Sequence, residues 1–294
     1  LTLHNYRTFC AAGIPMRNNK PCTGCLDKRS VLPALKYGCY RNSRLATLPM
    51  VTMVALHRRI GTWKKDVDAF IALTEFQREK LADAGLPRAN IHIKPHFYAD
   101  APAPLPWQKR EPKVIFIGRL SSEKGVHILL EAWKAWGNTA PYLEVIGDGP
   151  DKVALQKIIQ GAEIEQCVSF KGQLPFSETQ ERLALARLLV LPSLCFECFP
   201  MVIREAFALG VPVAGSRLGA IPCIVSDGEN GVLFAPGEPL DLYQVVKKAW
   251  DMPEKLSAMG KKAREEFDKK YTADANYKTL MQIYQAALAN RKKK

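Results

Sequence analysis

Short apolar runs alternate with longer amphipathic stretches over the second half of the chain. Strands that alternate with helices in this way are typical of a parallel sheet covered by helices on both faces. This half of the chain therefore predicts an α/β fold. We expect strands at residues 113–117, 143–146, 168–170, 188–191 and 211–214, and helices beginning near residues 124, 151, 177, 200 and 240.

Two further strands are predicted in the first half, at residues 68–73 and 91–94. Between them, Thr74 is a favourable helix-capping residue with Glu75 in the first turn behind it. That helix is expected to end at Gly85. The strand–helix–strand order indicates a second, smaller part of the same fold class.

The chain before residue 68 is less regular. Leu1–Leu3 resembles the end of a strand, and no leader peptide or domain start precedes it, so we expect that the beginning of this domain is missing. Residues 41–61 predict a helix, although Pro49 argues against a continuous one. The rest of residues 1–40 predicts an irregular, Cys-rich insertion.

A proline-rich stretch marks the clearest domain boundary. It contains Pro102, Pro104, Pro106 and Pro112. We therefore predict an N-terminal domain at residues 1–98, a linker at 99–112, a C-terminal domain at 113–275, and a terminal helix with a basic tail at 276–294.

The net charge of +13 is concentrated near the beginning of the chain. Residues 1–65 carry twelve Lys and Arg side chains but one acid, Asp27. Such a patch suits anionic lipid, a lipid-linked phosphate or nucleic acid, although a solvated basic face is an alternative. The longest apolar run, residues 45–56, is too short to span a bilayer.

This apolar run predicts contact with an anionic membrane surface, with packing inside the N-terminal domain as the alternative. The apolar side chains are Leu45, Leu48, Val51, Val54 and Leu56, and the basic ones around them are Arg41, Arg44, Arg58, Arg59, Lys64 and Lys65.

Four cysteines also lie in the basic region: Cys10, Cys22, Cys25 and Cys39. A Cys-x2-Cys pair supplies two ligands from one turn, and a structural zinc site needs four. The spacing therefore predicts one structural zinc, while free thiols and disulfides remain alternatives. Nothing in the sequence indicates secretion, so disulfides are the weakest of the three.

The first motif with chemical potential is the loop at residues 118–125, between a strand and a helix. Ligands of parallel sheets lie at the carboxyl ends of the strands, where helix N-termini point. Arg119 and Lys124 in this loop could neutralise a diphosphate, although a helix-capping turn with two incidental charges explains them too. Gly147-Asp148-Gly149 after the next strand allows a second tight turn near a ligand.

The second motif is a pair of glutamates, Glu197 and Glu205, separated by seven residues. Pro200 suits the first turn of a helix, which places Glu197 in the preceding loop and Glu205 inside the helix. The helix N-terminus offers free N–H groups, and the carboxylates can accept hydrogen bonds from sugar hydroxyl groups. The mostly apolar surroundings argue against ordinary surface charges.

In their order and spacing, these motifs resemble the retaining glycosyltransferases of family 4, which have the GT-B fold of two Rossmann-like domains facing a cleft. The resemblance covers residues 113–290, and residues 2–74 resemble the second half of the family's N-terminal domain. The landmarks are Gly118-Arg119-x4-Lys124-Gly125, Gly147-Asp148-Gly149, Phe170-Lys171-Gly172, Glu197-x7-Glu205, Gly210-Val211-Pro212-Val213 and Asp227-Gly228-Glu229-Asn230-Gly231.

The resemblance implies roles in binding a nucleoside-diphosphate sugar, the donor. Arg119 and Lys124 would hold the diphosphate, and Glu205 would bind the ribose hydroxyl groups. Gly172 and Gln173 would lie near the base.

It also implies roles around the reacting sugar. Glu197, with the backbone around Cys198, Phe199 and Pro200, would hold the transferred sugar. His4 would be the active-site histidine of the N-terminal domain. Two departures stand out: the family's glycine-rich loop of that domain is missing, and Cys223 replaces an acid often found after the proline at 222.

The expected function is transfer of a sugar to an acceptor hydroxyl group, with retention, in polysaccharide or glycolipid assembly. No metal is required, because protein cations stabilise the leaving diphosphate. The acceptor is expected to be lipid-linked or a saccharide, and the location cytoplasmic, with the inner face of the membrane as one possibility. The alternatives are another GT-B enzyme such as an epimerase, and a zinc-knuckle module binding nucleic acid, which leaves the ordered motifs unexplained.

Overall fold

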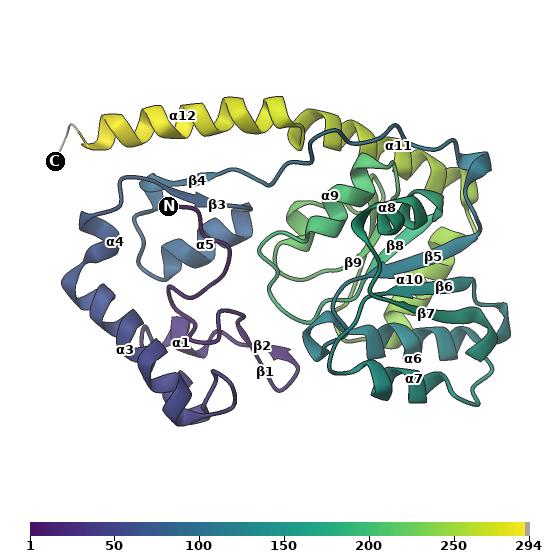
Figure 1. The fold of residues 1–294 in the computed structure, drawn as a ribbon, viewed down its shortest axis with the longest axis horizontal. Helices are drawn as coiled ribbons and strands as arrows, with labels where there is room; N and C mark the ends of the chain where they lie inside the picture. The colour runs from purple at the N-terminus through teal and green to yellow at the C-terminus, as the bar shows by residue number, and fades with distance from the viewer. Residues whose placement is uncertain (292–294) are drawn as a thin grey trace. The chain divides into compact units, whose positions relative to one another are not determined.

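The computed structural model describes residues 1–291, and the predicted basic tail at 292–294 lies outside them. The chain divides into two compact units (Figure 1). The N-terminal unit contains Leu1–His96, Cys195–Phe199 and the terminal helix from Asp274 onward. The C-terminal unit contains Phe97–Leu194 and Pro200–Ala273.

The predicted linker at residues 99–112 differs from this division, since it forms part of the C-terminal unit. The buried guanidinium of Arg110 explains why. It donates to the carbonyl oxygens of Ala186 at 3.1 Å and Leu209 at 2.7 Å, which ties the proline-rich segment to the body of the unit.

The C-terminal unit is built on a six-stranded parallel sheet with the order β10-β9-β8-β5-β6-β7. The chain runs outward from β5 through β6 to β7, and then returns to the other side of β5. All five strands predicted for this unit are confirmed, and β10 was not predicted. The strands are β5 Lys113–Ile117, β6 Tyr142–Ile146, β7 Val168–Gly172, β8 Leu188–Leu191, β9 Val213–Ser216 and β10 Gly231–Phe234.

Helices cover both faces of this sheet (Figure 1). On one face α6 packs between α7 and α10, and on the other α9 packs between α8 and α11. Large apolar side chains such as Trp133 and Phe207 are fully buried beneath them. The helices are α6 Val126–Trp136, α7 Lys152–Ile159, α8 Phe176–Leu185, α9 Met201–Ala208, α10 Pro239–Trp250 and α11 Pro253–Lys270.

The N-terminal unit contains a small parallel sheet of β3, Phe70–Ala72, and β4, Ile91–Ile93. Helix α5, Glu75–Asp83, joins them, and the hydroxyl of Thr74 caps it by accepting from the Gln77 amide, as predicted. The first residues of the chain bond to β3 in strand fashion. Helix α12, Ala273–Arg291, buries Ile283 against β3.

The irregular segment of this unit contains one long helix, α3, Arg44–Ile60. It is continuous, so the predicted interruption at Pro49 is wrong. Pro49 removes one N–H group from an exposed turn, where water can satisfy the carbonyl oxygen left without a partner. The shorter elements are the hairpin β1 Met16–Arg17 and β2 Lys20–Pro21, with α1 Gly24–Asp27, α2 Leu32–Tyr37 and α4 Thr62–Lys65.

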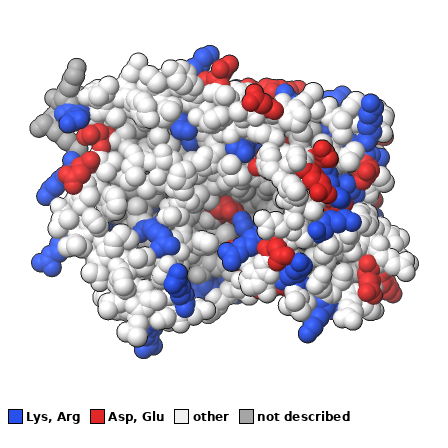
Figure 2. Space-filling view, viewed as in Figure 1, with Lys and Arg blue, Asp and Glu red and all other residues white. Residues whose placement is uncertain are grey.

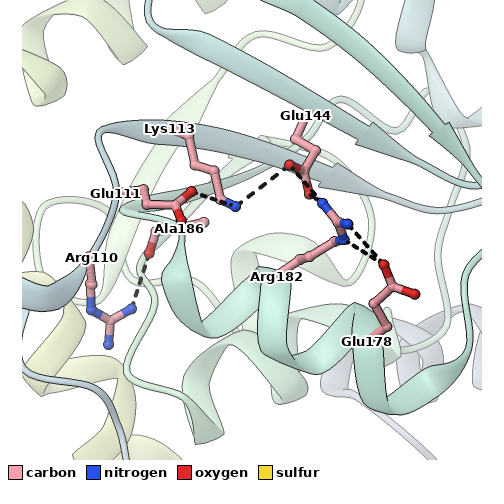
Figure 3. Close-up of polar contacts among 7 residues, drawn as sticks. All are labelled: Arg110, Glu111, Lys113, Glu144, Glu178, Arg182 and Ala186. Carbon is pink, nitrogen blue, oxygen red and sulfur yellow. Dashed lines mark hydrogen bonds and ion pairs between the residues drawn. The ribbon is translucent and has the colours of Figure 1, made fainter.

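A buried glutamate within the large sheet is held by two cations (Figure 3). The Glu144 side chain is 4% exposed and lies 3.6 Å from the Lys113 ammonium and 3.4 Å from the Arg182 guanidinium. Glu111 and Glu178 complete the chain of ion pairs, at 2.9 Å from Lys113 and 2.8 Å from Arg182. These ion pairs link Lys113 of β5, Glu144 of β6 and Arg182 of α8.

We expect Glu144→Ala to lower the free energy of unfolding of the C-terminal unit by about 3 kcal/mol, because it removes the carboxylate shared by two cations and leaves the buried Lys113 poorly compensated. Urea unfolding followed by tryptophan fluorescence measures this. The control is Glu265→Ala, since Glu265 forms an exposed ion pair with Lys262 and should change little. Equal effects in the two variants would contradict the structural role of Glu144.

Candidate active site

The order of strands in the C-terminal unit reverses between β5 and β8. Open parallel sheets bind their ligands beyond the carboxyl ends of the strands at such a reversal. Strand β5 ends at Ile117 and β8 ends at Leu191. The loops that follow contact one another, since the Leu194 amide donates to the Glu123 carbonyl oxygen at 2.8 Å. The motif at residues 118–125 therefore lies at the reversal point.

Main-chain hydrogen bonds also join the loops that follow β5, β6 and β7. The Leu120 amide donates to the Asp148 carbonyl oxygen at 2.9 Å, and the Gly147 amide donates to the Gly172 carbonyl oxygen at 2.8 Å. The three loops at this edge of the sheet form one hydrogen-bonded layer.

Glycine is required where these loops approach each other. A Cβ atom on Gly147 would lie 1.8 Å from the Gly118 carbonyl oxygen, and one on Gly125 would lie 2.0 Å from the Pro192 carbonyl oxygen. Both glycines also have positive φ angles, +140° and +68°. The glycines of the two predicted loops therefore serve close backbone packing.

The structure places the predicted donor-binding residues of this unit on the same edge of the sheet. Arg119 is exposed in the loop after β5, and Lys124 is half-buried in a single 3-10 turn of that loop. Gly172 ends β7, and Gln173 follows it with an exposed side chain. Two cations and one polar side chain thus belong to the loops at this edge of the sheet.

Glu205 lies in α9 with its side chain 12% exposed. The Gln180 side chain donates to one carboxylate oxygen at 3.1 Å, and the neighbouring Arg204 donates to the other at 3.3 Å. Burial lowers the pKa of Arg204, and the Glu205 carboxylate acts in the opposite direction. Glu205 is therefore held in place by polar neighbours, unlike a surface charge.

Tyr98 completes this arrangement. Its hydroxyl donates to the Gln180 side-chain oxygen at 3.4 Å, and its ring lies 5.3 Å from the Arg204 guanidinium carbon. None of Tyr98, Gln180 and Arg204 was predicted to belong to the site. Tyr98 and Gln180 lie in no motif, and Arg204 was not distinguished from the other residues between Glu197 and Glu205.

In the N-terminal unit, the predicted catalytic residue His4 is exposed and stacks on a second histidine, His96. The ring centroids are 5.3 Å apart and the planes differ by 3°. The edge of His96 also packs against the Phe199 ring, with centroids 5.8 Å apart. His96 follows β4. It was not predicted as a site residue, because a single histidine outside any motif does not indicate a functional role.

The loop Cys195–Phe199 is held by side chains of the N-terminal unit. The Tyr6 hydroxyl donates to the Glu197 carbonyl oxygen at 3.3 Å, and the Thr74 hydroxyl donates to the Cys198 carbonyl oxygen at the same distance. Burial raises the pKa of Cys198 to about 12, so its thiol stays protonated at neutral pH. His4, Glu197, Cys198 and Phe199 thus belong to one compact unit.

The four cysteines of the predicted zinc site lie near one another. Burial raises the pKa of Cys10 to about 11, and negative charge on Cys25 or Cys39 acts in the same direction. Negative charge on Cys22 would likewise raise the pKa of Cys25 and of Cys39. Within residues 1–291, however, no group of three or more His, Cys, Asp or Glu side chains is placed to hold a metal ion. The thiols are free and the zinc remains a prediction.

Helix α3 divides the apolar side chains that were predicted to contact a membrane. Val51 and Val54 are buried in a cluster inside the N-terminal unit, so their assignment to a membrane surface is wrong. Leu45 is 84% exposed, and Leu48 and Leu56 are exposed as well. Along the described part of the chain, no helix combines the length and the apolar character needed to cross a membrane.

Basic side chains surround the exposed face of α3. Over the part of the N-terminal unit that contains α3 and the β1–β2 hairpin, at the lower left, Figure 2 shows Lys and Arg side chains without acidic ones among them. The basic excess of residues 1–65 is therefore displayed on the surface beside exposed leucines.

Comparison with known proteins gives this geometry a context. The model of the family "Glycosyl transferases group 1" matches residues 99–266. Sulfoquinovosyl transferase SQD2 of Arabidopsis thaliana is 32% identical over 186 residues, which are 62% of this chain and 35% of that protein. A GDP-mannose-dependent phosphatidylinositol monomannoside mannosyltransferase of Mycolicibacterium smegmatis is 28% identical over 225 residues, 69% of this chain and 57% of that one.

Solved structures show the same fold. S. aureus TarM matches with a TM-score of 0.67 and 23% identity over 78% of this chain and 46% of TarM. HepE of Anabaena, in complex with UDP and glucose, matches with a TM-score of 0.66 and 19% identity over 90% of this chain and 84% of HepE. The predicted GT-B fold is therefore confirmed. The chain spans less than half the length of the first curated relatives it matches.

Proposed function

Because the chain belongs to the group 1 glycosyltransferases, we propose that it transfers a sugar from a nucleoside diphosphate to an acceptor hydroxyl group. The observation that supports this most directly is the loop with Arg119 and Lys124, which follows β5 at the reversal point of the sheet. HepE, which has the same fold, binds UDP and glucose. A nucleoside diphosphate is the corresponding ligand here.

Departure of the sugar builds negative charge on the diphosphate. Arg119 and Lys124 stabilise that charge, together with the free amide groups at the start of α9. These groups supply the electrostatic stabilisation that a bound divalent metal gives in other enzymes, so the reaction we propose requires none.

The remaining roles follow the resemblance to family 4, with retention at the anomeric carbon. Glu205 binds the ribose hydroxyl groups through the carboxylate that Gln180 and Arg204 orient. Gly172 and Gln173 line the base.

Around the transferred sugar, Glu197 binds its hydroxyl groups with the backbone of Cys198, Phe199 and Pro200. His4 is the catalytic histidine of the N-terminal unit. The acceptor is a saccharide or a lipid-linked saccharide of polysaccharide or glycolipid assembly.

A panel of nucleoside diphosphates and their sugars, tested by thermal shift, examines the donor proposal. A ligand that binds only the folded state raises the melting temperature with concentration. We expect nucleotides with one particular base to raise the melting temperature more than the others. If no member of the panel raised the melting temperature at millimolar concentration, the donor proposal would fail.

We further propose that α3 rests on the anionic cytoplasmic face of a membrane, where a lipid-linked acceptor is available. Exposed Leu45 and Leu56 enter the interface while the surrounding Lys and Arg side chains contact lipid phosphates. Each basic residue near an anionic surface contributes about 1 kcal/mol.

Sedimentation with liposomes tests this surface. We expect binding that requires anionic lipid, weakens with salt and is lost in the double variant Leu45→Ser, Leu56→Ser. The matched control is Leu240→Ser, which changes an exposed leucine of the C-terminal unit and should bind like the parent. Equal recovery in the supernatant with neutral and anionic liposomes at low salt would contradict the proposal.

The structural zinc at Cys10, Cys22, Cys25 and Cys39 is proposed on the sequence spacing alone. Metal analysis of the purified protein should find one zinc per chain, and Cys25→Ser should lose it. Cys223→Ser is the control, because Cys223 is exposed and outside the group. Zinc-free protein whose four thiols all react in the native state would rule the site out.

A further inference from the structure

A cavity of about 550 Å³ lies entirely within the N-terminal unit. The ends of α3 and α5 form two of its sides, and α4 and the segment around α1 form the others. Its polar lining residues are Thr8, Arg29, His57, Arg58, Trp63, Lys64 and Asp83. None of these residues was assigned a role in donor binding or catalysis.

The lining is strongly basic. Arg29, Arg58 and Lys64 bring three positive charges to the cavity, against one acid, Asp83. That carboxylate is already engaged, because the Lys80 ammonium lies 3.3 Å from its Oδ2 atom. The electrostatic potential inside the cavity therefore favours an anion.

Three residues that line the cavity also carry buried hydrogen-bond donors that have no acceptor. The Thr8 hydroxyl, the Arg58 Nε and the Trp63 Nε1 are buried and form no hydrogen bond. They account for three of the seven such side-chain atoms in residues 1–291, and all three belong to residues that line this one cavity. Folded proteins rarely leave buried donors unmet unless a bound molecule satisfies them.

Thr8 gives the clearest case. It is 7% exposed, and its hydroxyl lies in a cavity-lining segment. Nδ1 of His57 forms a hydrogen bond with the Thr62 hydroxyl at 3.0 Å. Nε2 is therefore the ring nitrogen that can bind a ligand. The donors come from three separate segments around one cavity, as expected for a site that surrounds a ligand with several acceptor atoms.

We propose that this cavity binds the phosphate group of a phosphomonoester. Phosphate has enough acceptor oxygens for the Thr8, Arg58 and Trp63 donors, and its charge matches Arg29, Arg58 and Lys64. Leu26 and Leu86 offer an apolar wall to the group that carries the phosphate. The proposal makes no use of the donor loops, so its failure would leave the proposed sugar transfer untouched.

The Trp63 indole proton reports directly on this site, and NMR resolves it after assignment with Trp63→Phe. Two probes distinguish the sources of phosphate: glycerol 3-phosphate, which is soluble, and phosphatidic acid dispersed in neutral detergent micelles. We expect the signal to move and saturate, and Arg58→Gln or Thr8→Val to raise the Kd at least tenfold. The control is Arg88→Gln, an exposed arginine of the same unit outside both the cavity and the basic face of α3, which should leave the Kd unchanged.

A shift with glycerol 3-phosphate that Arg58→Gln abolishes would support the site with a soluble ligand. A shift with phosphatidic acid alone, also abolished by Arg58→Gln, would support it with a lipid headgroup. A Trp63 signal that moves with neither probe would overturn the proposal. Equal weakening by Arg88→Gln would also overturn it, because a general effect of positive charge would then explain the binding. Unchanged amide signals of β3 and α5, which belong to the same unit as the cavity, show that Arg58→Gln is folded.

Discussion

Replacing Glu197 with alanine is expected to lower the turnover of sugar transfer by about 100-fold or more, the loss typical for a positioned group that acts on the reacting centre. Nucleotide affinity should stay close to that of the parent. The reason is the position of Glu197 in the loop Cys195–Phe199, whose backbone is fixed by Tyr6 and Thr74. Truncating the side chain leaves that backbone in place and removes the carboxylate alone.

Steady-state transfer assays and calorimetry with the cognate nucleoside diphosphate separate the two quantities for Glu197→Ala. Glu181→Ala is the control, since Glu181 is exposed on α8 and outside the predicted site. If the variant transferred sugar at the parental rate, Glu197 would have no role in holding the transferred sugar. If Glu197→Ala changed only the affinity for the nucleoside diphosphate, Glu197 would instead contact the nucleotide.

Glu205→Ala is expected to weaken nucleotide binding, whereas Glu197→Ala is expected to lower turnover. We expect nucleoside diphosphate to bind about 30-fold more weakly, which corresponds to about 2 kcal/mol and is typical for removing a charged hydrogen-bond partner. The carboxylate is 12% exposed and oriented by Gln180 and Arg204, so it is positioned in advance for hydroxyl groups. The loss of affinity should appear with the nucleoside diphosphate as well as with the complete nucleotide sugar.

Calorimetry with the diphosphate measures this effect. Because Arg204 is buried beside Glu205, the variant could also lose stability, so Glu205→Gln is compared with it. Glutamine keeps the shape and removes the charge, and it should weaken binding with little unfolding. Binding by both variants with parental affinity would show that Glu205 does not contact the nucleotide.

Local patterns predicted the large sheet well because its strands are short, apolar and separated by turns. The bounds of β5 and β8 agree with the predicted 113–117 and 188–191. Strand β10, Gly231–Phe234, was not predicted. It is a short edge strand that directly follows a turn, and no alternation of apolar and polar residues distinguishes it from that turn. Pro49 was misjudged because a proline penalty depends on exposure, which the sequence does not give.

The site was predictable only as far as its residues lie in motifs. The glycine-rich loops and the two glutamates form motifs, and the structure shows why they carry glycine or a fixed carboxylate. His96 and Tyr98 are adjacent to no motif, and their contacts with Phe199 and Gln180 join segments far apart in the chain. Val51 and Val54 turned inward because only one face of α3 packs against the unit.

The hydrogen-bonded layer of loops after β5, β6 and β7 has a consequence for how such an enzyme diversifies. Main-chain atoms hold this layer, so exchanging the exposed side chains at Arg119 or Gln173 leaves the register of Leu120 on Asp148 unchanged. Inserting or deleting one residue would break that register. Relatives that use other nucleotide sugars are therefore expected to differ here in side-chain identity while keeping the loop lengths.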